Sequence, residues 1–523
     1  MMTFRSEITW EKMKASGREE DFHSLYEQAS YELLSSVRGT PVVYPNHIDG
    51  VPSLSQKTFD DMSPVDQDLL VGRFQRSSKE EVLRAIKSAR NSFHTWSRTD
   101  WEDRVSIFEK AAELMRKDKF QLAAAITLDN GKTRNESVAE VDEAIDFLTY
   151  YSAEMRRNEG FQRSPEPVYE EEEISLLLRP YGVWAIICPF NFPLAISTGM
   201  VTGALITGNT AVIKPSSNAP LPVHLLYEIL DRAGLPPGTL SLVAGGGHEV
   251  GDPLVNGDID GVAFTGSLEV GNNIMRSAAT NGRQVIAEMG SKNPVIVSGE
   301  ADLDEAAKGV AASAFLFSGQ KCSAASRIYV HESVYGSFMS KLIDEASDMI
   351  VGDPFERETD IGPVITNQAM DNYLRWTETA RRDGKLILSG KALGSSRGLY
   401  ARPAIVESLP EEHELMRREL FVPILCIQSY ITLQDAMVRC NASDFGLTAG
   451  IFTRNETEAR YFCEAIESGV VYVNRHRGAT TGAMVGSQAF AGWKASASTG
   501  MGTGSRYYLP QFMREQSRTI VRS

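Results

Sequence analysis

The chain has 523 residues and a formal net charge of −15, with 42% hydrophobic and 23% charged residues. This length exceeds that of one ordinary hydrophobic core, so two or three domains of a soluble globular protein are expected. Basic residues form no obvious patch, which argues against a nucleic-acid partner. The most apolar stretch, residues 183–196, contains Pro189, Asn191 and Pro193, which excludes an ordinary membrane helix and a membrane partner.

Helical periodicity dominates the first third of the chain. Residues 8–37 are polar and helix-prone, so we expect an N-terminal helical extension. Segments 81–96, 104–129 and 138–157 carry apolar residues at three- and four-residue spacing, and each predicts an amphipathic helix. Residues 158–180 then turn polar and include four consecutive glutamates, which we expect to face solvent.

After residue 180, short apolar strands alternate with helices. The expected strands of this first series lie at 182–187, 210–215, 240–245, 261–267 and 284–290, and a second series begins at 293. Such a succession predicts an α/β fold in which helices cover both faces of a parallel sheet. Ligands of these sheets bind at the carboxyl ends of the strands.

The cysteines indicate a reducing compartment. All five are widely scattered, their number is odd, and no CxxC pair occurs, so we expect neither a disulfide framework nor a zinc site. The N-terminal residues lack the apolar core of a secretory signal. We therefore predict a cytoplasmic protein without a metal.

Two loops of the first βα series are candidates for anion binding. Lys214 follows a strand, where its ammonium could reach a ribose or a phosphate, although most lysines at strand ends are only solvated. Gly266 and Ser267 open a helix, and free N–H groups at a helix start favour a pyrophosphate. The GxGxxG fingerprint is absent, because Val250 stands where its third glycine is needed.

Three other residues suggest chemistry. Asn191 lies between aromatic residues and prolines, where its amide could donate to an oxyanion or cap a turn. Glu288 ends an apolar strand, a costly place for a carboxylate unless it is paired or functional. Cys322 lies in "GQKCSAASR", among small polar neighbours that pack without a sulfur, and its alternative is a small buried filler.

Six segments in this order resemble the aldehyde dehydrogenase superfamily, and the resemblance covers nearly the whole chain. They are "PFNFP", "KPSSNAP", "FTGSLEVG", "AEMGSKNP", "GQKCSAASR" and "ELFVP". The resemblance implies a Rossmann-like cofactor domain, an α/β catalytic domain and a small β hairpin for oligomerisation. We expect the cofactor domain at 1–157 and 179–289, with 1–40 as its extension, the catalytic domain at 290–498, and the oligomerisation segment at 158–178 and 499–523. Because such hairpins donate a strand to a neighbour's sheet, at least a homodimer is expected.

The resemblance also implies a mechanism. Cys322 would be the nucleophile that attacks an aldehyde carbon, and the Asn191 amide would hold the resulting oxyanion together with the Cys322 N–H. Collapse of the adduct would expel a hydride to the nicotinamide of NAD or NADP and leave a thioester. Glu288 would then activate the water that hydrolyses this thioester.

Cofactor contacts carry over by position. Lys214 matches the lysine that reaches the adenosine ribose, and Glu419 and Phe421 match the pair that holds the nicotinamide end. Ser217 stands where the family commonly has a glutamate that repels a 2′-phosphate, so NADP should be tolerated. Val422 replaces the usual glycine after Phe421, which bears on how closely the backbone approaches the cofactor.

Within the superfamily the resemblance is greatest to the 1-pyrroline-5-carboxylate dehydrogenases, through segments 143–154, 319–327 and 480–498. This implies oxidation of L-glutamate γ-semialdehyde to glutamate in proline catabolism, with a functional link to a proline dehydrogenase. "AFAG" at 489–492 replaces the usual Pro-Phe-Gly-Gly, and its two added methyl groups, on Ala489 and Ala491, could alter the substrate tunnel.

The same resemblance assigns the substrate contacts. Ser323 and the N–H groups of Gly482 and Ala483 would bind the α-carboxylate. Phe490 would pack against the aliphatic part of the substrate. Glu136 could meet the ammonium, although a surface glutamate is the commoner outcome for such a residue.

Other functions stay open at this point. A dehydrogenase of another carboxylated semialdehyde, such as succinate semialdehyde, would lack the need for an ammonium partner. A coenzyme-A-acylating enzyme would not need Glu288, and a cysteine hydrolase would need a histidine partner, which no recognisable motif supplies. A non-catalytic cofactor-binding or scaffold protein is disfavoured because Cys322 and Glu288 are both present.

Overall fold

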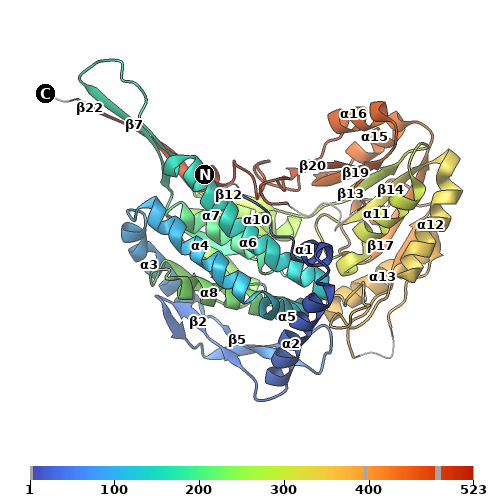
Figure 1. The fold of residues 1–523 in the computed structure, drawn as a ribbon, viewed down its shortest axis with the longest axis horizontal. Coiled ribbons are helices and arrows are strands. Elements are labelled where there is room, and N and C mark those ends of the chain that lie inside the picture. The colour runs from blue at the N-terminus through green and yellow to red at the C-terminus, as the bar shows by residue number, and fades with distance from the viewer. Residues whose placement is uncertain (1–3, 394–396, 477–483, 522–523) are drawn as a thin grey trace.

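The computed structural model describes residues 4–393, 397–476 and 484–521. Its ribbon has two lobes, each with a sheet of its own, and a hairpin that projects from the first lobe (Figure 1). Mixed sheets with helices packed against them confirm the predicted α/β fold.

The first lobe contains a seven-stranded sheet in the order β12-β11-β8-β9-β10-β2-β3. Its five parallel strands are those predicted from the first βα series: β8 (Val183–Ile187), β9 (Thr210–Lys214), β10 (Leu240–Leu242), β11 (Gly261–Thr265) and β12 (Gln284–Glu288). The short antiparallel strands β2 (Asn46–Ile48) and β3 (Val51–Ser53) extend one edge. Each has only three residues and lies close to a turn, and no strand was predicted there.

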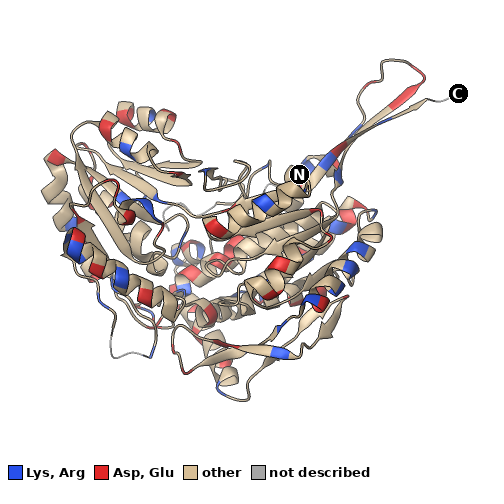
Figure 2. Cartoon of the chain, turned by 180° about the vertical axis from the view of Figure 1, so that it is seen from behind, with Lys and Arg blue, Asp and Glu red and all other residues tan. Residues whose placement is uncertain are grey.

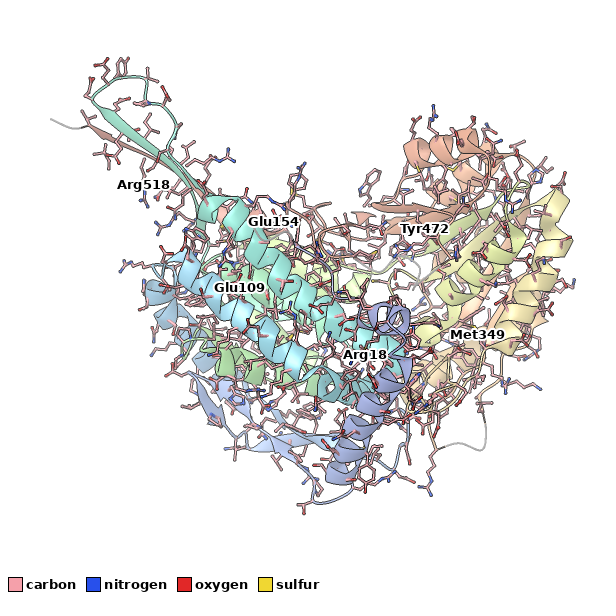
Figure 3. All side chains as sticks on the ribbon, in the orientation of Figure 1. Arg18, Glu109, Glu154, Met349, Tyr472 and Arg518 are labelled. Atoms are coloured by element: carbon pink, nitrogen blue, oxygen red, sulfur yellow. The ribbon has the colours of Figure 1, made fainter. Side chains whose placement is uncertain are left out.

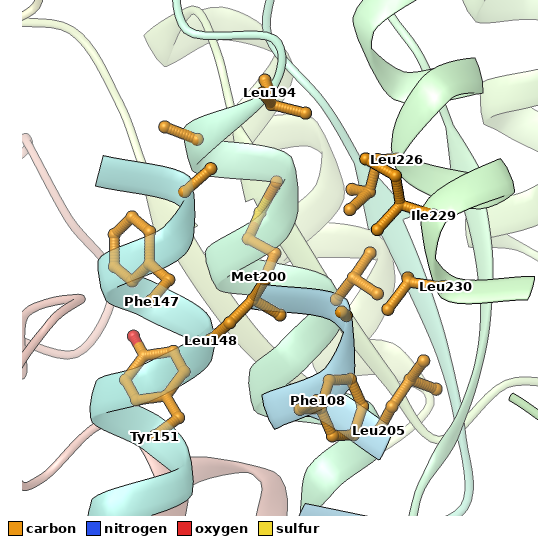
Figure 4. Packing of buried hydrophobic residues seen from close by; sticks show 14 of the residues in the cluster. Phe108, Phe147, Leu148, Tyr151, Leu194, Met200, Leu205, Leu226, Ile229 and Leu230 are labelled. Carbon is orange, nitrogen blue, oxygen red and sulfur yellow. The ribbon is translucent and has the colours of Figure 1, made fainter. Parts of the chain in front are cut away.

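Helices of the first lobe pack against this sheet. They are α3 (Lys79–Trp96), α4 (Trp101–Lys117), α5 (Lys119–Asn130), α6 (Arg134–Arg157), α7 (Ala195–Ile206), α8 (Leu221–Ala233), α9 (Asp252–Val255) and α10 (Leu268–Thr280). The single helix expected over 104–129 is two helices that meet at Asp118. The largest apolar cluster lies among α4, α6, α7 and α8, where Phe108, Leu148, Leu205 and Leu230 interlock (Figure 4).

The second lobe contains a seven-stranded sheet in the order β15-β16-β17-β14-β13-β19-β20. Its strands are β13 (Asn293–Val297), β14 (Ala325–His331), β15 (Lys385–Leu388), β16 (Ala404–Glu407), β17 (Ile424–Tyr430), β19 (Thr448–Phe452) and β20 (Val470–Val473). Its helices are α11 (Leu303–Phe315), α12 (Tyr335–Asp348), α13 (Asn367–Asp383), α14 (Glu414–Arg417), α15 (Leu433–Asn441) and α16 (Glu456–Ala465). Only β15 runs antiparallel to its neighbour.

The projecting hairpin is built from β7 (Glu172–Pro180) and β22 (Met513–Val521), with β6 (Gln162–Arg163) on the other edge of β7. Its sheet is antiparallel, and the register runs from Met513 opposite Pro180 to Val521 opposite Glu172. Part of the ribbon of this hairpin is red, which marks acidic residues (Figure 2), as expected of the glutamate run. Just before β22, Tyr508 and Phe512 are buried in the core of the first lobe. The division of the chain into domains stays a prediction.

Two small sheets and the N-terminal extension complete the structure. The small sheets contain β1 (Val43–Tyr44), β4 (Lys57–Met62) and β5 (Leu70–Arg76), and β18 (Phe445–Gly446) with β21 (Trp493–Lys494). The extension is helical, as expected, with α1 (Thr9–Ala15) and α2 (Glu19–Val37). Phe22 and Tyr26 of α2 are buried, and Glu27 pairs with both Arg134 and Arg357. The extension therefore contacts both lobes.

None of the helices formed by residues 4–393, 397–476 and 484–521 combines the length and the apolar character that a bilayer crossing requires. The same ranges contain no group of three or more His, Cys, Asp and Glu side chains placed to hold a metal ion.

Candidate active site

A cavity of about 680 Å³, measured with its mouth, lies where α6, α7, the ends of β11 and β12, and the Cys322 loop meet. Its walls are mostly apolar, and Phe147 of α6 and Met200 of α7 contribute to them (Figure 4). Cys322 and Glu288 line this same cavity. The two lie in different lobes of the sheet structure, so only the tertiary fold brings the thiol and the carboxyl together.

The backbone before Cys322 makes an unusual turn. Phe317, Ser318 and Gly319 all have positive φ, at 52°, 54° and 67°. A Cβ on Gly319 would lie 2.9 Å from the Val422 carbonyl oxygen, so glycine is required both for conformation and for space. The carbonyl of Cys322 accepts hydrogen bonds from the Asn293 amide, at 2.7 Å, and from the Ser291 hydroxyl. These contacts hold the thiol in place.

Burial raises the pKa of the Cys322 thiol, and the negative charges of Glu419 and Glu288 raise this pKa further. The thiol is therefore protonated in the protein alone. Attack on an aldehyde requires the thiolate, so the proton must leave as the nucleophile forms.

Glu288 is the last residue of β12 and is buried. Its Oε2 makes no hydrogen bond within the part of the chain that the structure describes, and its main-chain carbonyl accepts from the Gly266 N–H at 3.1 Å. Burial raises the pKa of the carboxyl well above its usual range. A carboxyl of this kind, unpaired and facing a cavity, is suited to take a proton during catalysis.

Asn191 lies at the start of the segment that leads into α7, and its side chain is buried. Its Nδ2 donates a hydrogen bond to the carbonyl of Gln320, 3.2 Å away and two residues before Cys322. The amide therefore contacts the loop of the nucleophile, which the predicted oxyanion role requires, but one of its donors is engaged with that loop.

The predicted adenosine and pyrophosphate contacts lie at carboxyl ends of strands. Lys214 ends β9, its ammonium donates to the Pro215 carbonyl at 2.9 Å, and burial lowers its pKa. The Ser217 hydroxyl donates to the Gly245 carbonyl at 3.2 Å. Ser267 is the N-cap of α10, and a Cβ on Gly266 would lie 2.6 Å from the Phe264 ring. A helix start and a buried lysine, each after a strand of the same sheet, fit the phosphates and ribose of a dinucleotide.

The predicted nicotinamide contacts lie beside the Cys322 loop. Glu419 accepts from the Ser291 N–H at 2.8 Å, and burial raises the pKa of its carboxyl to about 7. The ring of Phe421 packs edge-on against Phe190, and its φ of 57° is in the left-handed region. The Glu419 carboxyl, which can hold ribose hydroxyls, thus borders one small pocket together with the Phe421 ring and Val422.

The predicted substrate contacts are brought together only in part. Ser323 and Phe490 line the catalytic cavity, whereas Gly482 and Ala483 lie outside the described residues. Glu136 forms an ion pair with Lys321 at 2.9 Å, next to the nucleophile in sequence, so its carboxylate already has a cationic partner.

A model of the aldehyde dehydrogenase family matches residues 51–517. The chain belongs to this family. It is therefore an oxidoreductase that acts on aldehyde groups with a nicotinamide cofactor, NAD or NADP. The match begins after α2, so the N-terminal extension lies outside the residues that the family model matches.

Relatives and solved structures agree with this assignment. A curated 1-pyrroline-5-carboxylate dehydrogenase of Bacillus cytotoxicus is 35% identical over 472 residues, which are 89% of this chain and 90% of the relative. A solved 1-pyrroline-5-carboxylate dehydrogenase from Thermus with bound NAD superposes with a TM-score of 0.91 at 32% identity, over 100% of this chain and 99% of that one. Proline utilization A from Bdellovibrio bacteriovorus superposes at 0.92 with 35% identity over 99% of this chain, which spans only 53% of that longer protein.

This family member has one site residue that sequence reasoning missed. Glu143 lines the catalytic cavity, and burial raises the pKa of its carboxyl to about 8. It lies two helical turns beyond Glu136 on α6, so the helical period could have placed both on one face. In the structure, the part of this helix face that borders the cavity begins at Glu143 and continues through Phe147.

The turn that contains Ala489 and Ala491, two departures from the family pattern, makes close backbone contacts. Phe490 and Thr503 exchange two main-chain hydrogen bonds, at 3.0 and 3.1 Å, so the turn that carries Ala489 and Ala491 is held in place. The carbonyl of Ala491 would lie 1.8 Å from a Cβ on Gly469. The turn therefore packs too tightly for any side chain at Gly469.

Proposed function

We propose that this chain oxidises L-glutamate γ-semialdehyde, the open form of 1-pyrroline-5-carboxylate, to L-glutamate with NAD or NADP. The observation that carries the proposal is that a thiol and an unpaired carboxyl, Cys322 and Glu288, line one cavity of an aldehyde dehydrogenase fold. The substrate is supported by the names of its relatives and by Ser323 and Phe490, which line that cavity as the glutamate reading expects.

The chain's own residues divide the chemistry into two stages. In the first, the Cys322 thiol releases its proton to solvent and its sulfur bonds to the aldehyde carbon, while the Asn191 amide stabilises the negative oxygen of the adduct. A bound nicotinamide supplies the acceptor for the hydride that leaves this carbon. A thioester on Cys322 remains.

In the second stage, Glu288 takes a proton from a water molecule as its oxygen attacks the thioester carbon. The carbon–sulfur bond breaks, the carboxylic acid is released, and the thiol regains its proton. The raised pKa of Glu288 makes its ionised carboxylate a stronger base for this step.

The substrate is tested by comparing kcat/KM for glutamate semialdehyde and for succinate semialdehyde under identical conditions. Glutamate semialdehyde carries an ammonium group that can pair with a cavity carboxyl such as Glu143. A charge-assisted hydrogen bond contributes about 1.5–3 kcal/mol, so we expect its kcat/KM to be at least about tenfold higher. Equal or reversed values would favour the second candidate, a dehydrogenase of carboxylated semialdehydes without an amine.

Ser217 should control the choice of cofactor. Because its short hydroxyl donates to a backbone carbonyl and bears no charge, NADP should be used with a kcat/KM within about tenfold of that for NAD. The Ser217→Glu variant places a carboxylate near the 2′-phosphate, and it should lose about tenfold or more in kcat/KM for NADP alone.

Ser217→Gln is the matched control for this prediction, because it has nearly the same size without the charge. It should leave the ratio of the two cofactors within about threefold of the wild-type ratio. If both variants discriminate equally against NADP, size and not charge sets the preference.

The proposed assembly is a homo-oligomer built from dimers in the cytoplasm. β22 forms one edge of the projecting hairpin, and a nine-residue strand with an open edge is a template for pairing with another chain. β20 is an edge strand of the sheet of the second lobe. Arg518 of β22 lies far from Tyr472 of β20 in the same chain (Figure 3), so β22 would pair with β20 of a second copy. A monomeric mass in sedimentation equilibrium would contradict the proposed oligomer.

A functional link to a proline dehydrogenase is also proposed, because oxidation of proline supplies the substrate.

A further inference from the structure

A buried lysine lies between the two loops of the catalytic site. Lys132 precedes α6, and its side chain is only 1% exposed. Its ammonium donates a hydrogen bond to the main-chain carbonyl of Asn191. The neighbouring Asn130 amide donates to the carbonyl of Phe190 at 3.3 Å. Two consecutive carbonyls of the Asn191 segment are therefore held from the turn that begins α6.

Glu140, the acidic partner of Lys132, also contacts the segment that contains Asn191. Glu140 of α6 pairs with the Lys132 ammonium through Oε2, at 2.5 Å, and is itself fully buried. Its Oε1 accepts from the N–H groups of Leu194 and Ala195, at 2.8 and 3.2 Å. The ion pair thus contacts the segment both at Asn191 and at the start of α7.

Lys132 also contacts the loop of the nucleophile. Its ammonium lies 3.7 Å from the centre of the Phe192 ring and 4.5 Å from that of Phe317. Phe192 follows Asn191, whereas Phe317 begins the positive-φ turn that leads to Cys322. A cation between two ring faces attracts both, and the attraction strengthens when water is excluded.

We propose that Lys132 is a positioning residue that sets the Asn191 amide against Cys322, a role that rests on the proposed oxyanion function of Asn191. The lysine contacts one aromatic ring from each loop and the main chain of Asn191, and its charge is balanced by Glu140. A buried ion pair often contributes little net stability, so the role proposed for this one is to fix geometry at the reacting carbon.

The test uses the full-length protein and the rate constant of the first burst of reduced cofactor, with glutamate semialdehyde as substrate. The double variant Lys132→Met/Glu140→Gln removes both charges and keeps an acceptor oxygen for the α7 amides. We expect the burst to slow roughly tenfold to a hundredfold, because small misplacements of a catalytic donor cost about this much. The Kd of the cofactor should stay within about twofold.

A matched control is present on the same helix. Lys119 is also buried and pairs with Asp142 of α6 at 2.6 Å, but it contacts the N-terminal extension through Thr9 and neither catalytic loop. Lys119→Met/Asp142→Asn should therefore leave the burst rate within about twofold. Lys132→Gln/Glu140→Gln, which also leaves no unpaired buried charge, is the second variant should the first double variant fail to reach the wild-type Tm.

The decisive readout is a double-mutant cycle with Asn191→Ala. If Lys132 acts through Asn191, Lys132→Met/Glu140→Gln should slow the burst by less than about threefold when it is made in the Asn191→Ala background. A full, multiplicative loss in that background, or no loss in the native one, overturns the positioning role. If Asn191→Ala alone leaves the burst unchanged, Asn191 is not the oxyanion donor, and the failure lies in the proposed function on which the role of Lys132 rests.

Discussion

The Cys322→Ser variant is expected to lose turnover by on the order of 10⁴-fold or more while it still binds NAD. A hydroxyl is far less acidic than a thiol and is essentially un-ionised at neutral pH, so the cavity would contain no nucleophile. Glu288 and Glu419 strengthen this expectation, because their charges already disfavour an anion at position 322. Absorbance at 340 nm measures turnover, and fluorescence titration measures the Kd of the cofactor.

Cys463 provides the control for this variant, because it is an exposed free cysteine on α16 and lines neither the catalytic cavity nor the pocket of Glu419. Cys463→Ser should therefore retain wild-type kcat and KM. Turnover of Cys322→Ser near the wild-type value would mean that the aldehyde is not attacked by this sulfur, and the covalent mechanism would be wrong.

The second large effect is expected at Glu288. In Glu288→Ala the Cys322 thiol and the Asn191 amide are intact, so the thioester should form but hydrolyse about 10²–10⁴-fold more slowly. Rapid mixing should record a burst of reduced cofactor, close to one equivalent per site, followed by a low steady rate. Absence of the burst would show that Glu288 also acts before hydride transfer, as in the activation of the thiol.

The pH dependence of wild-type turnover has a defined sign. Since burial raises the pKa of Glu288 above its usual value of 4.5, the base is neutral at low pH and the hydrolysis rate should increase as pH rises through the raised pKa. The same shift destabilises the folded protein as pH rises above 4.5, because the unfolded chain ionises first. Glu288→Gln cannot ionise, so its Tm should decline less than that of the wild type over this window.

Much of the fold was predictable from local pattern. The five parallel strands of the first sheet are short apolar runs between helical segments, and this alternation predicted them. The break at Asp118 and the strands β2 and β3 were not identified. The break could not be seen because the apolar period continues through Asp118. β2 is a strand because it pairs with β10, which lies far along the chain.

The alternation of strands and helices predicts the α/β class, and six ordered motifs indicate the family and the candidates Cys322, Glu288 and Asn191. The structure brought Cys322 and Glu288 to one cavity and set Asn191 against the loop of the thiol. Only the tertiary structure revealed Lys132 as the cation between both loops and Glu143 as a cavity carboxyl. The reason is physical: periodicity reports which face of a helix is buried, but it does not report which distant loops that face meets. The main chain of Asn191 and the Phe317 ring, which Lys132 contacts, come from segments far along the chain.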